Sequence, residues 1–60
     1  MKLKLYRIWF NDGSEVMFFS DELETKAKSF SFDANEVLLT GETELKDEDG
    51  DVVGGVSLYE

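Results

Sequence analysis

Cysteine, histidine and proline are all absent from this 60-residue sequence. Without Cys there can be no disulfide, and without Cys or His a transition-metal site lacks its usual soft or borderline ligands. The same absences remove the common proton shuttle and the thiol nucleophile of enzymes. We therefore expect no enzyme activity, no cofactor and no bound metal, and a cytoplasmic location, because a cysteine-free chain suits a reducing compartment.

Long apolar runs are also missing, since even the longest, Val16-Met17-Phe18-Phe19, has four residues. A membrane span needs about eighteen, and no apolar region of the kind found in signal peptides follows Met1–Leu5. We expect a single soluble domain over residues 1–60. A chain this short buries only about 60% of its unfolded surface, so self-association is an expected aid to stability.

Basic residues are scarce, with six against 14 acidic residues and a net charge of −8. Residues 1–30 hold five acids and five bases, whereas residues 31–60 hold nine acids and only Lys46. This balance argues against direct binding to nucleic acid or to an anionic membrane. It favours a protein partner with a basic surface.

Two Asp-Gly pairs predict two β-hairpins. Asp12-Gly13 lies between the β-rich runs 3–10 and 15–19, and Asp49-Gly50 lies between 42–47 and 51–59. Within the last run, Gly54-Gly55 predicts a bulge or a close backbone approach.

The middle of the chain is less regular. A third hairpin is predicted from 30–32 and 37–39 around the turn-favouring 33–35. For residues 21–29 a short helix capped by Ser20 is favoured over a strand, because Leu23, Ala27 and Phe30 then share a face. The predicted fold is mainly β: a small antiparallel sheet or partly open barrel of four to five strands, with one short helix near 21–29.

The stretch from Ala27 to Glu60 resembles the strands of the jelly-roll repeats in lipopolysaccharide-transport bridge proteins. The resemblance lies in a turn, the Leu-Thr-Gly of residues 39–41, an Asp-Gly turn and a closing Leu-Tyr at 58–59. It implies strands and turns through the second half of the chain. No function is carried over, because those proteins are longer and exported.

The first candidate site is acidic. Glu42 and Glu44 lie two residues apart on a predicted strand, hence on one face and roughly 6.8 Å apart. The turn that follows adds four more acids: Asp47, Glu48, Asp49 and Asp51. These six residues form either a partner-binding face that imitates nucleic acid or an ordinary solvated surface that protects a sheet edge. The spacing of the turn acids does not match a calcium-binding EF-hand loop.

The second candidate site is aromatic. The first strand is apolar on both faces, with Leu3, Leu5 and Trp9 opposite Tyr6, Ile8 and Phe10. Either a helix covers one face and long side chains cover the other, or the hairpin forms an interface. The interface interpretation names Tyr6, Trp9 and Phe19.

Two functions remain open from these patterns. The first is a small acidic protein-binding module, such as a viral (phage) or mobile-element inhibitor that occupies a basic, nucleic-acid-binding surface of a host protein. The alternative is a structural homo-oligomer, expected to be a dimer, assembled through its aromatic N-terminal hairpin. The dependence of binding on ionic strength distinguishes the two functions, since salt weakens charge-driven binding and strengthens apolar association.

Overall fold

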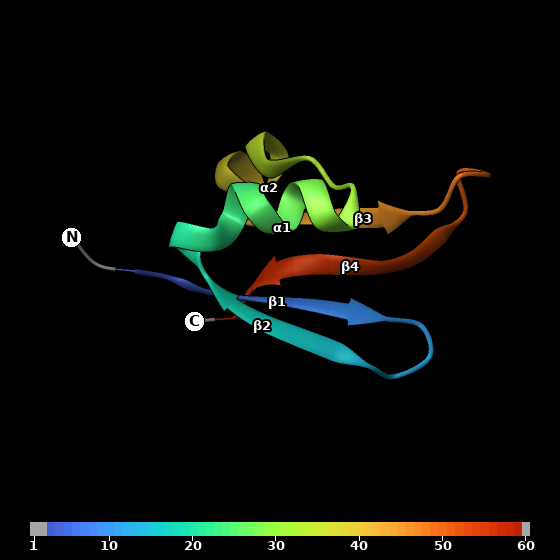
Figure 1. Cartoon of the computed structure of the whole chain (residues 1–60), viewed down its shortest axis with the longest axis horizontal. Helices are drawn as coiled ribbons and strands as arrows, with labels where there is room; N and C mark the ends of the chain where they lie inside the picture. The colour runs from blue at the N-terminus through green and yellow to red at the C-terminus, as the bar shows by residue number, and fades with distance from the viewer. Residues whose placement is uncertain (1–2, 60) are drawn as a thin grey trace.

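The computed structural model describes residues 3–59 and shows an open four-stranded antiparallel sheet with helices on one side (Figure 1). The elements in chain order are β1 (Leu5–Phe10), β2 (Glu15–Phe19), a 3₁₀ turn η1 (Ser20–Glu22), α1 (Leu23–Phe30), α2 (Ala34–Thr40), β3 (Glu42–Lys46) and β4 (Val52–Leu58). The strand order is β2-β1-β4-β3, so the C-terminal hairpin docks beside β1. A mainly β fold built on a small antiparallel sheet is confirmed.

The N-terminal hairpin forms where the Asp-Gly pair predicts it. Gly13 has a φ of 95°, a left-handed conformation that suits glycine. The Asp12 carboxylate accepts hydrogen bonds from the Ser14 hydroxyl at 2.7 Å and the Ser14 amide at 2.9 Å. These bonds stabilise the charged form and lower the pKa of Asp12 below its ordinary value.

The C-terminal hairpin is also confirmed, with Gly50 in its turn at a φ of 86°. Its register shifts between Leu45 and Lys46, which marks a bulge. The Gly54-Gly55 pair is the site of a close approach instead: a Cβ atom at Gly54 would overlap the Trp9 carbonyl oxygen and lie 3.0 Å from Phe10 Cα. Gly54 therefore lets β4 lie against β1.

The helix over 21–29 is confirmed, but its predicted cap is wrong. Leu23 and Ala27 are buried, and Lys26 lies 3.8 Å from Glu22, as an i,i+4 pair on a helix should. The Ser20 hydroxyl instead accepts a hydrogen bond from the Lys4 amide at 3.1 Å. The Ser20 hydroxyl therefore bonds to the segment before β1 and does not cap the helix.

The third hairpin is wrong, because residues 34–40 form α2. Asp33 is its N-cap: the carboxylate accepts hydrogen bonds from the amides of Asn35 and Glu36 at 2.9 and 3.3 Å. Gly41, with a φ of 84°, ends the helix. The strands implied by the resemblance to jelly-roll repeats are therefore absent from this stretch.

The core lies between the two helices and one face of the sheet. It consists of nine buried residues: Tyr6, Ile8, Phe18, Leu23, Ala27, Phe32, Val37, Leu45 and Val56. Tyr6 stacks on Phe18 with ring centroids 5.6 Å apart and is only 3% exposed. Its place in the interface prediction needs correction, because a side chain packed under the helices cannot meet a partner. Within residues 3–59, no helix is long and apolar enough to cross a membrane.

Candidate functional site

Within residues 3–59, no helix or strand covers the face of the sheet that is turned away from the helices (Figure 1). Strand alternation places Leu5, Arg7 and Trp9 of β1 on it, together with Glu15, Met17 and Phe19 of β2, Gly55 and Ser57 of β4, and Glu42 and Glu44 of β3. We call this surface the open face. Two of the three residues of the aromatic prediction, Trp9 and Phe19, therefore lie on the open face, whereas Tyr6 points the other way.

The indole of Trp9 lies across the neighbouring strand. A Cβ atom at Gly55 would stand only 2.7 Å from Trp9 Cη2, so the missing side chain at Gly55 makes room for the ring. Trp9 is half-buried as a result. The glycine pair thus has two roles, with Gly54 accommodating the backbone of β1 and Gly55 accommodating its tryptophan.

Arg7 occupies the open face beside Trp9. Its Nε lies 2.8 Å from a carboxylate oxygen of Glu15, and its guanidinium carbon lies 5.6 Å from the indole centroid. Both partners of the ion pair are well exposed, with 39% and 49% of their side chains accessible, so the pair contributes little to stability. It shows, however, that the indole here accepts a guanidinium.

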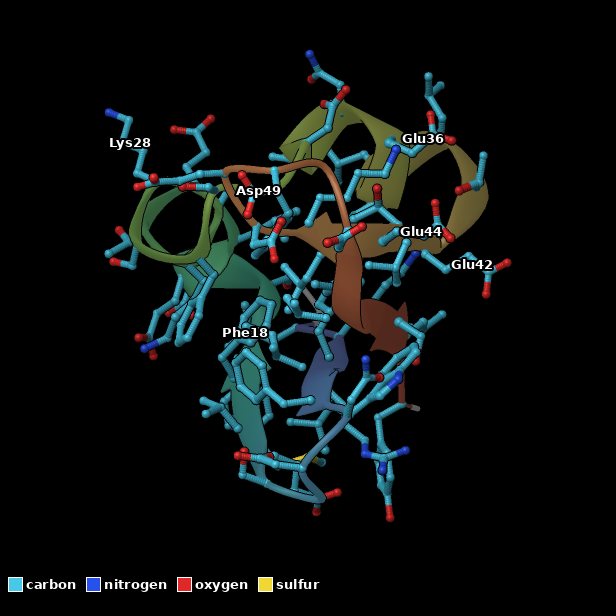
Figure 2. The ribbon with its side chains drawn as sticks, turned by 90° about the vertical axis from the view of Figure 1, so that its right-hand side faces the viewer. Phe18, Lys28, Glu36, Glu42, Glu44 and Asp49 are labelled. Carbon is cyan, nitrogen blue, oxygen red and sulfur yellow. The ribbon has the colours of Figure 1, made fainter. Side chains whose placement is uncertain are left out.

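A groove of about 620 Å³ begins at Trp9 and continues around β3 to α2. Its lining includes three carboxylates, those of Glu36, Glu42 and Glu44, which lie together on one side of the molecule, with Lys28 at the far side (Figure 2). The other lining residues are Asn11, Thr40, Thr43, Val52, Gly54 and Gly55. Among these described lining residues there is no Lys or Arg, so every charged side chain of the lining is negative.

Thr40 and Asn11 stabilise the two sides of the groove. Thr40 Oγ1 lies 2.9 Å from the carbonyl oxygen of Glu36 and 2.8 Å from that of Glu42, which joins the end of α2 to the start of β3. Asn11 Nδ2 donates to the carbonyl oxygen of Val52 at 3.1 Å. The groove is therefore held by hydrogen bonds that leave its carboxylates free to face solvent.

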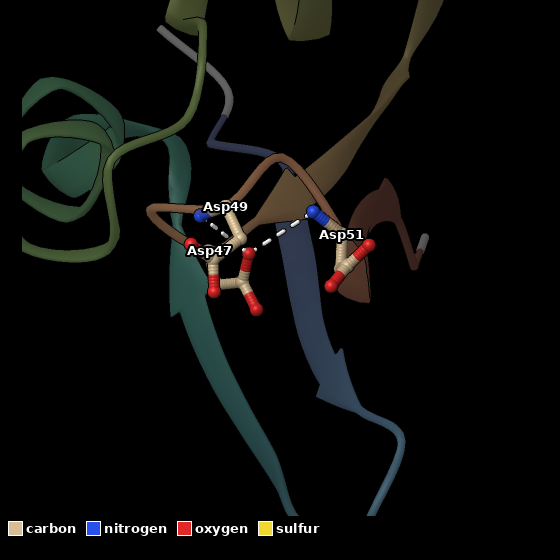
Figure 3. A group of neighbouring side chains, drawn as sticks. All are labelled: Asp47, Asp49 and Asp51. Atoms are coloured by element: carbon tan, nitrogen blue, oxygen red, sulfur yellow. Dashed lines mark hydrogen bonds between the residues drawn. The ribbon is translucent and has the colours of Figure 1, made fainter.

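The four turn acids lie outside the groove, in the connection between β3 and β4. Asp47 Oδ1 accepts hydrogen bonds from the amides of Asp49 at 2.9 Å and Asp51 at 3.0 Å (Figure 3). One carboxylate oxygen from each of these three residues falls within 4.8 Å of the others. All four turn acids are exposed, and the Asp47 carboxylate also stabilises the turn through its hydrogen bonds to the two amides.

The sequence prediction missed Glu36 and Thr40 as neighbours of Glu42 and Glu44. Both belong to α2, in a stretch that was assigned to a turn and a strand. The signals for the helix were present as Asp33 at the N-cap, Glu36 in the first turn and Gly41 after the last residue. With that helix assigned, Glu36 would have been placed one turn before Thr40, the last residue of the helix, and six residues before Glu42.

Comparison with known proteins gives no lead to function. No protein-family model matches the chain, and neither the curated proteins nor the solved structures contain a match. Function must therefore be argued from the geometry of the open face and the groove.

Proposed function

We propose that this protein is a small acidic protein-binding module that occupies a basic surface of its partner, such as a nucleic-acid-binding surface. One observation carries the proposal. The groove combines the Trp9 indole with three carboxylates, one from α2 and two from β3, and its described lining residues include no Lys or Arg. A cytoplasmic partner is proposed with it, since a cysteine-free chain suits a reducing compartment.

The groove has the chemistry to receive Arg or Lys side chains. Carboxylates accept charge-assisted hydrogen bonds from guanidinium and ammonium groups, and an indole attracts both cations. Arg7 already lies 5.6 Å from the Trp9 centroid within the chain, which supports this preference. A basic side chain of a partner would meet the same ring beside Glu44.

The charge of the second half as a whole favours the approach of a basic partner. Nine of the 14 acidic residues follow residue 30, against one base. Such a field steers a basic partner and raises the association rate, an effect that weakens with ionic strength. Binding to a partner that normally holds nucleic acid would release counterions from both charged surfaces into solution, which makes the affinity salt-dependent.

Charge reversal tests the proposal. Replacing Glu42→Lys with Glu44→Lys should weaken binding of a fluorescent oligo-arginine peptide by about tenfold or more, because close like charges at an interface cost several kcal/mol. The matched control, Asp21→Lys with Glu24→Lys, makes the same change in net charge at exposed positions away from the groove. Fluorescence anisotropy at several salt concentrations measures both.

Equal losses in the two double variants would reduce the effect to net charge and would contradict a groove-specific site. Unchanged binding in the groove variant would also contradict it. Thermal denaturation of each variant should stay near the wild type, because exposed substitutions usually change stability by about 0.5 kcal/mol or less.

The alternative function, a homo-oligomer assembled through the N-terminal hairpin, is favoured by a different observation. Met17 and Phe19 on β2 are 39% and 50% exposed, and both lie on the open face. Association through these side chains should persist or strengthen at high salt, whereas binding at the groove should weaken.

A further inference from the structure

The two edges of the sheet differ in their protection against pairing. At β3, a bulge interrupts the register, every second side chain is charged, and Thr40 Oγ1 lies 2.8 Å from the carbonyl oxygen of Glu42 and 3.4 Å from its amide. These are devices that keep an edge from pairing with another chain. At β2 the register is regular over its whole length, and Glu15 at its start is the strand's one charged residue.

The main chain of β2 offers hydrogen-bonding groups on its outer side. The Phe10 amide donates to the Ser14 carbonyl oxygen at 2.9 Å, and the Ser20 amide donates to the Lys4 carbonyl oxygen at 2.8 Å. Antiparallel alternation then turns the amides and carbonyls of residues 16 and 18 toward β1, and those of Glu15 and Met17 away from it. The Phe19 amide points outward for the same reason.

The side chains of β2 are apolar on both faces of the sheet at this edge. Met17 and Phe19 are exposed on the open face, and Val16 is half-buried beside Phe18 on the helix side. An arriving strand would therefore find apolar side chains above and below the free main-chain groups.

We propose that a second copy of this chain pairs with β2, antiparallel and across a two-fold axis at Met17, to form one continuous eight-stranded sheet. In this register the two Met17 residues exchange both main-chain hydrogen bonds, and the Phe19 amide of each copy donates to the Glu15 carbonyl of the other. Val16 of each copy then lies opposite Phe18 of the other on the helix side. The inference does not depend on the acidic groove.

The distribution of charge selects a second copy at β2 rather than β3. Strands lie about 4.8 Å apart, so pairing at β3 would bring the Glu42 and Glu44 carboxylates of two copies close together. Pairing at β2 places the two β3 strands at opposite ends of the sheet, roughly 34 Å apart across seven spacings. This separation is several times the Debye length of about 8 Å near physiological salt, so the acidic halves barely repel.

A single-cysteine experiment tests the register, because the native chain has no Cys. Paired residues at the axis have Cα atoms about 5.5 Å apart, within disulfide range. Met17→Cys should therefore form a covalent dimer under mild oxidation, and Lys46→Cys, on the opposite edge, should remain monomeric. Equal cross-linking of both variants, or none at Met17→Cys, would refute the proposed interface.

Sedimentation of the wild type and two further variants completes the test. The wild type should sediment as a dimer at micromolar concentration. Met17→Pro removes an amide that bonds to nothing within the sheet and should abolish the dimer without unfolding the monomer, since proline is tolerated at such edge positions. Met17→Lys should raise the dissociation constant by about tenfold or more, because it sets like charges face to face.

Circular dichroism distinguishes a variant that has lost the dimer from one that has unfolded. A folded, monomeric Met17→Pro or Met17→Lys beside a dimeric wild type supports the interface. A wild type that stays monomeric up to about 100 μM, well above the micromolar affinities of ordinary association, would overturn it. So would a dimer that survives both substitutions.

Discussion

At the residue scale, the adjacent glycines of β4 face different neighbours. A Cβ atom at Gly54 would overlap main-chain atoms of β1, whereas one at Gly55 would meet the indole of Trp9. A backbone contact can be relieved only by moving the strands apart. A side-chain contact can be relieved by rotating the ring toward solvent, at lower cost.

This difference predicts unequal effects of two alanine substitutions. Gly54→Ala should lower the free energy of unfolding by about 3 kcal/mol, while Gly55→Ala should cost about 1 kcal/mol or less. Gly55→Ala should instead shift the fluorescence of Trp9, the one tryptophan of the chain, to longer wavelength as the ring moves into water. Urea denaturation and emission spectra measure both, and similar stability losses without a spectral shift would count against this account.

At the element scale, α2 is a seven-residue helix whose stability depends on its ends and its packing. A helix this short is marginal by itself in water. Asp33 satisfies two amides at its start, Gly41 ends it, and Val37 buries its inner face at 1% exposure. Leu38 and Leu39, at 65% and 83% exposure, contribute little to that packing.

Removing the cap should therefore loosen α2 and the groove wall that carries Glu36. We expect Asp33→Ala to lower the free energy of unfolding by about 1 kcal/mol, the usual value of an N-cap side chain. Asp51→Ala removes the same charge from an exposed turn and is the matched control, with an expected change of about 0.5 kcal/mol or less. Chemical denaturation compares the two; a loss no larger for Asp33→Ala would show that the cap is not needed.

At the scale of the whole molecule, the dominant feature is unequal charge. The second half holds nine acids and one base, and the two ion pairs of the described residues, Arg7–Glu15 and Lys26–Glu22, both lie in the first half. We therefore expect mutual repulsion among the acids to oppose folding more than the ion pairs favour it.

Salt should accordingly stabilise the protein. At one fixed protein concentration, raising sodium chloride from about 20 to about 500 mM should raise the melting temperature, because the Debye length falls from tens of ångströms to a few. Differential scanning calorimetry gives the measurement. A falling melting temperature would mean that the exposed ion pairs outweigh the repulsion.

The features that the sequence determined by itself are local. Asp12-Gly13 and Asp49-Gly50 specify their hairpins because a tight turn needs backbone angles that these residues adopt readily, whatever lies around them. The helix at 23–30 was predictable for a similar reason, since Leu23, Ala27 and Phe30, at i, i+4 and i+7, share a face in a helix, whereas in a strand Phe30 would lie opposite Leu23. The sheet as the main architecture follows from these elements.

The short segment 33–40 could not be assigned from its pattern alone. Asp33-Ala34-Asn35 suits both a turn and a helix N-terminus, because the same carboxylate that closes a turn also caps amides. Val37-Leu38-Leu39 is too short for periodicity to separate a strand from a helix. Packing of Val37 into the core decides for the helix, and that choice also brings Glu36 beside Glu42.

Only the tertiary structure decided which apolar face of the first hairpin is covered. Strand alternation separates Tyr6 from Trp9 but does not say which side the helices take. The helices α1 and α2, which connect β2 to β3, lie over Tyr6 and bury it. Trp9 is left on the open face, where its ring lies on Gly55. The acidic groove and the unpaired β2 edge were also decided by tertiary structure, because the groove joins α2 to β3 and β1, and the edge depends on the pairing of β4 with β1.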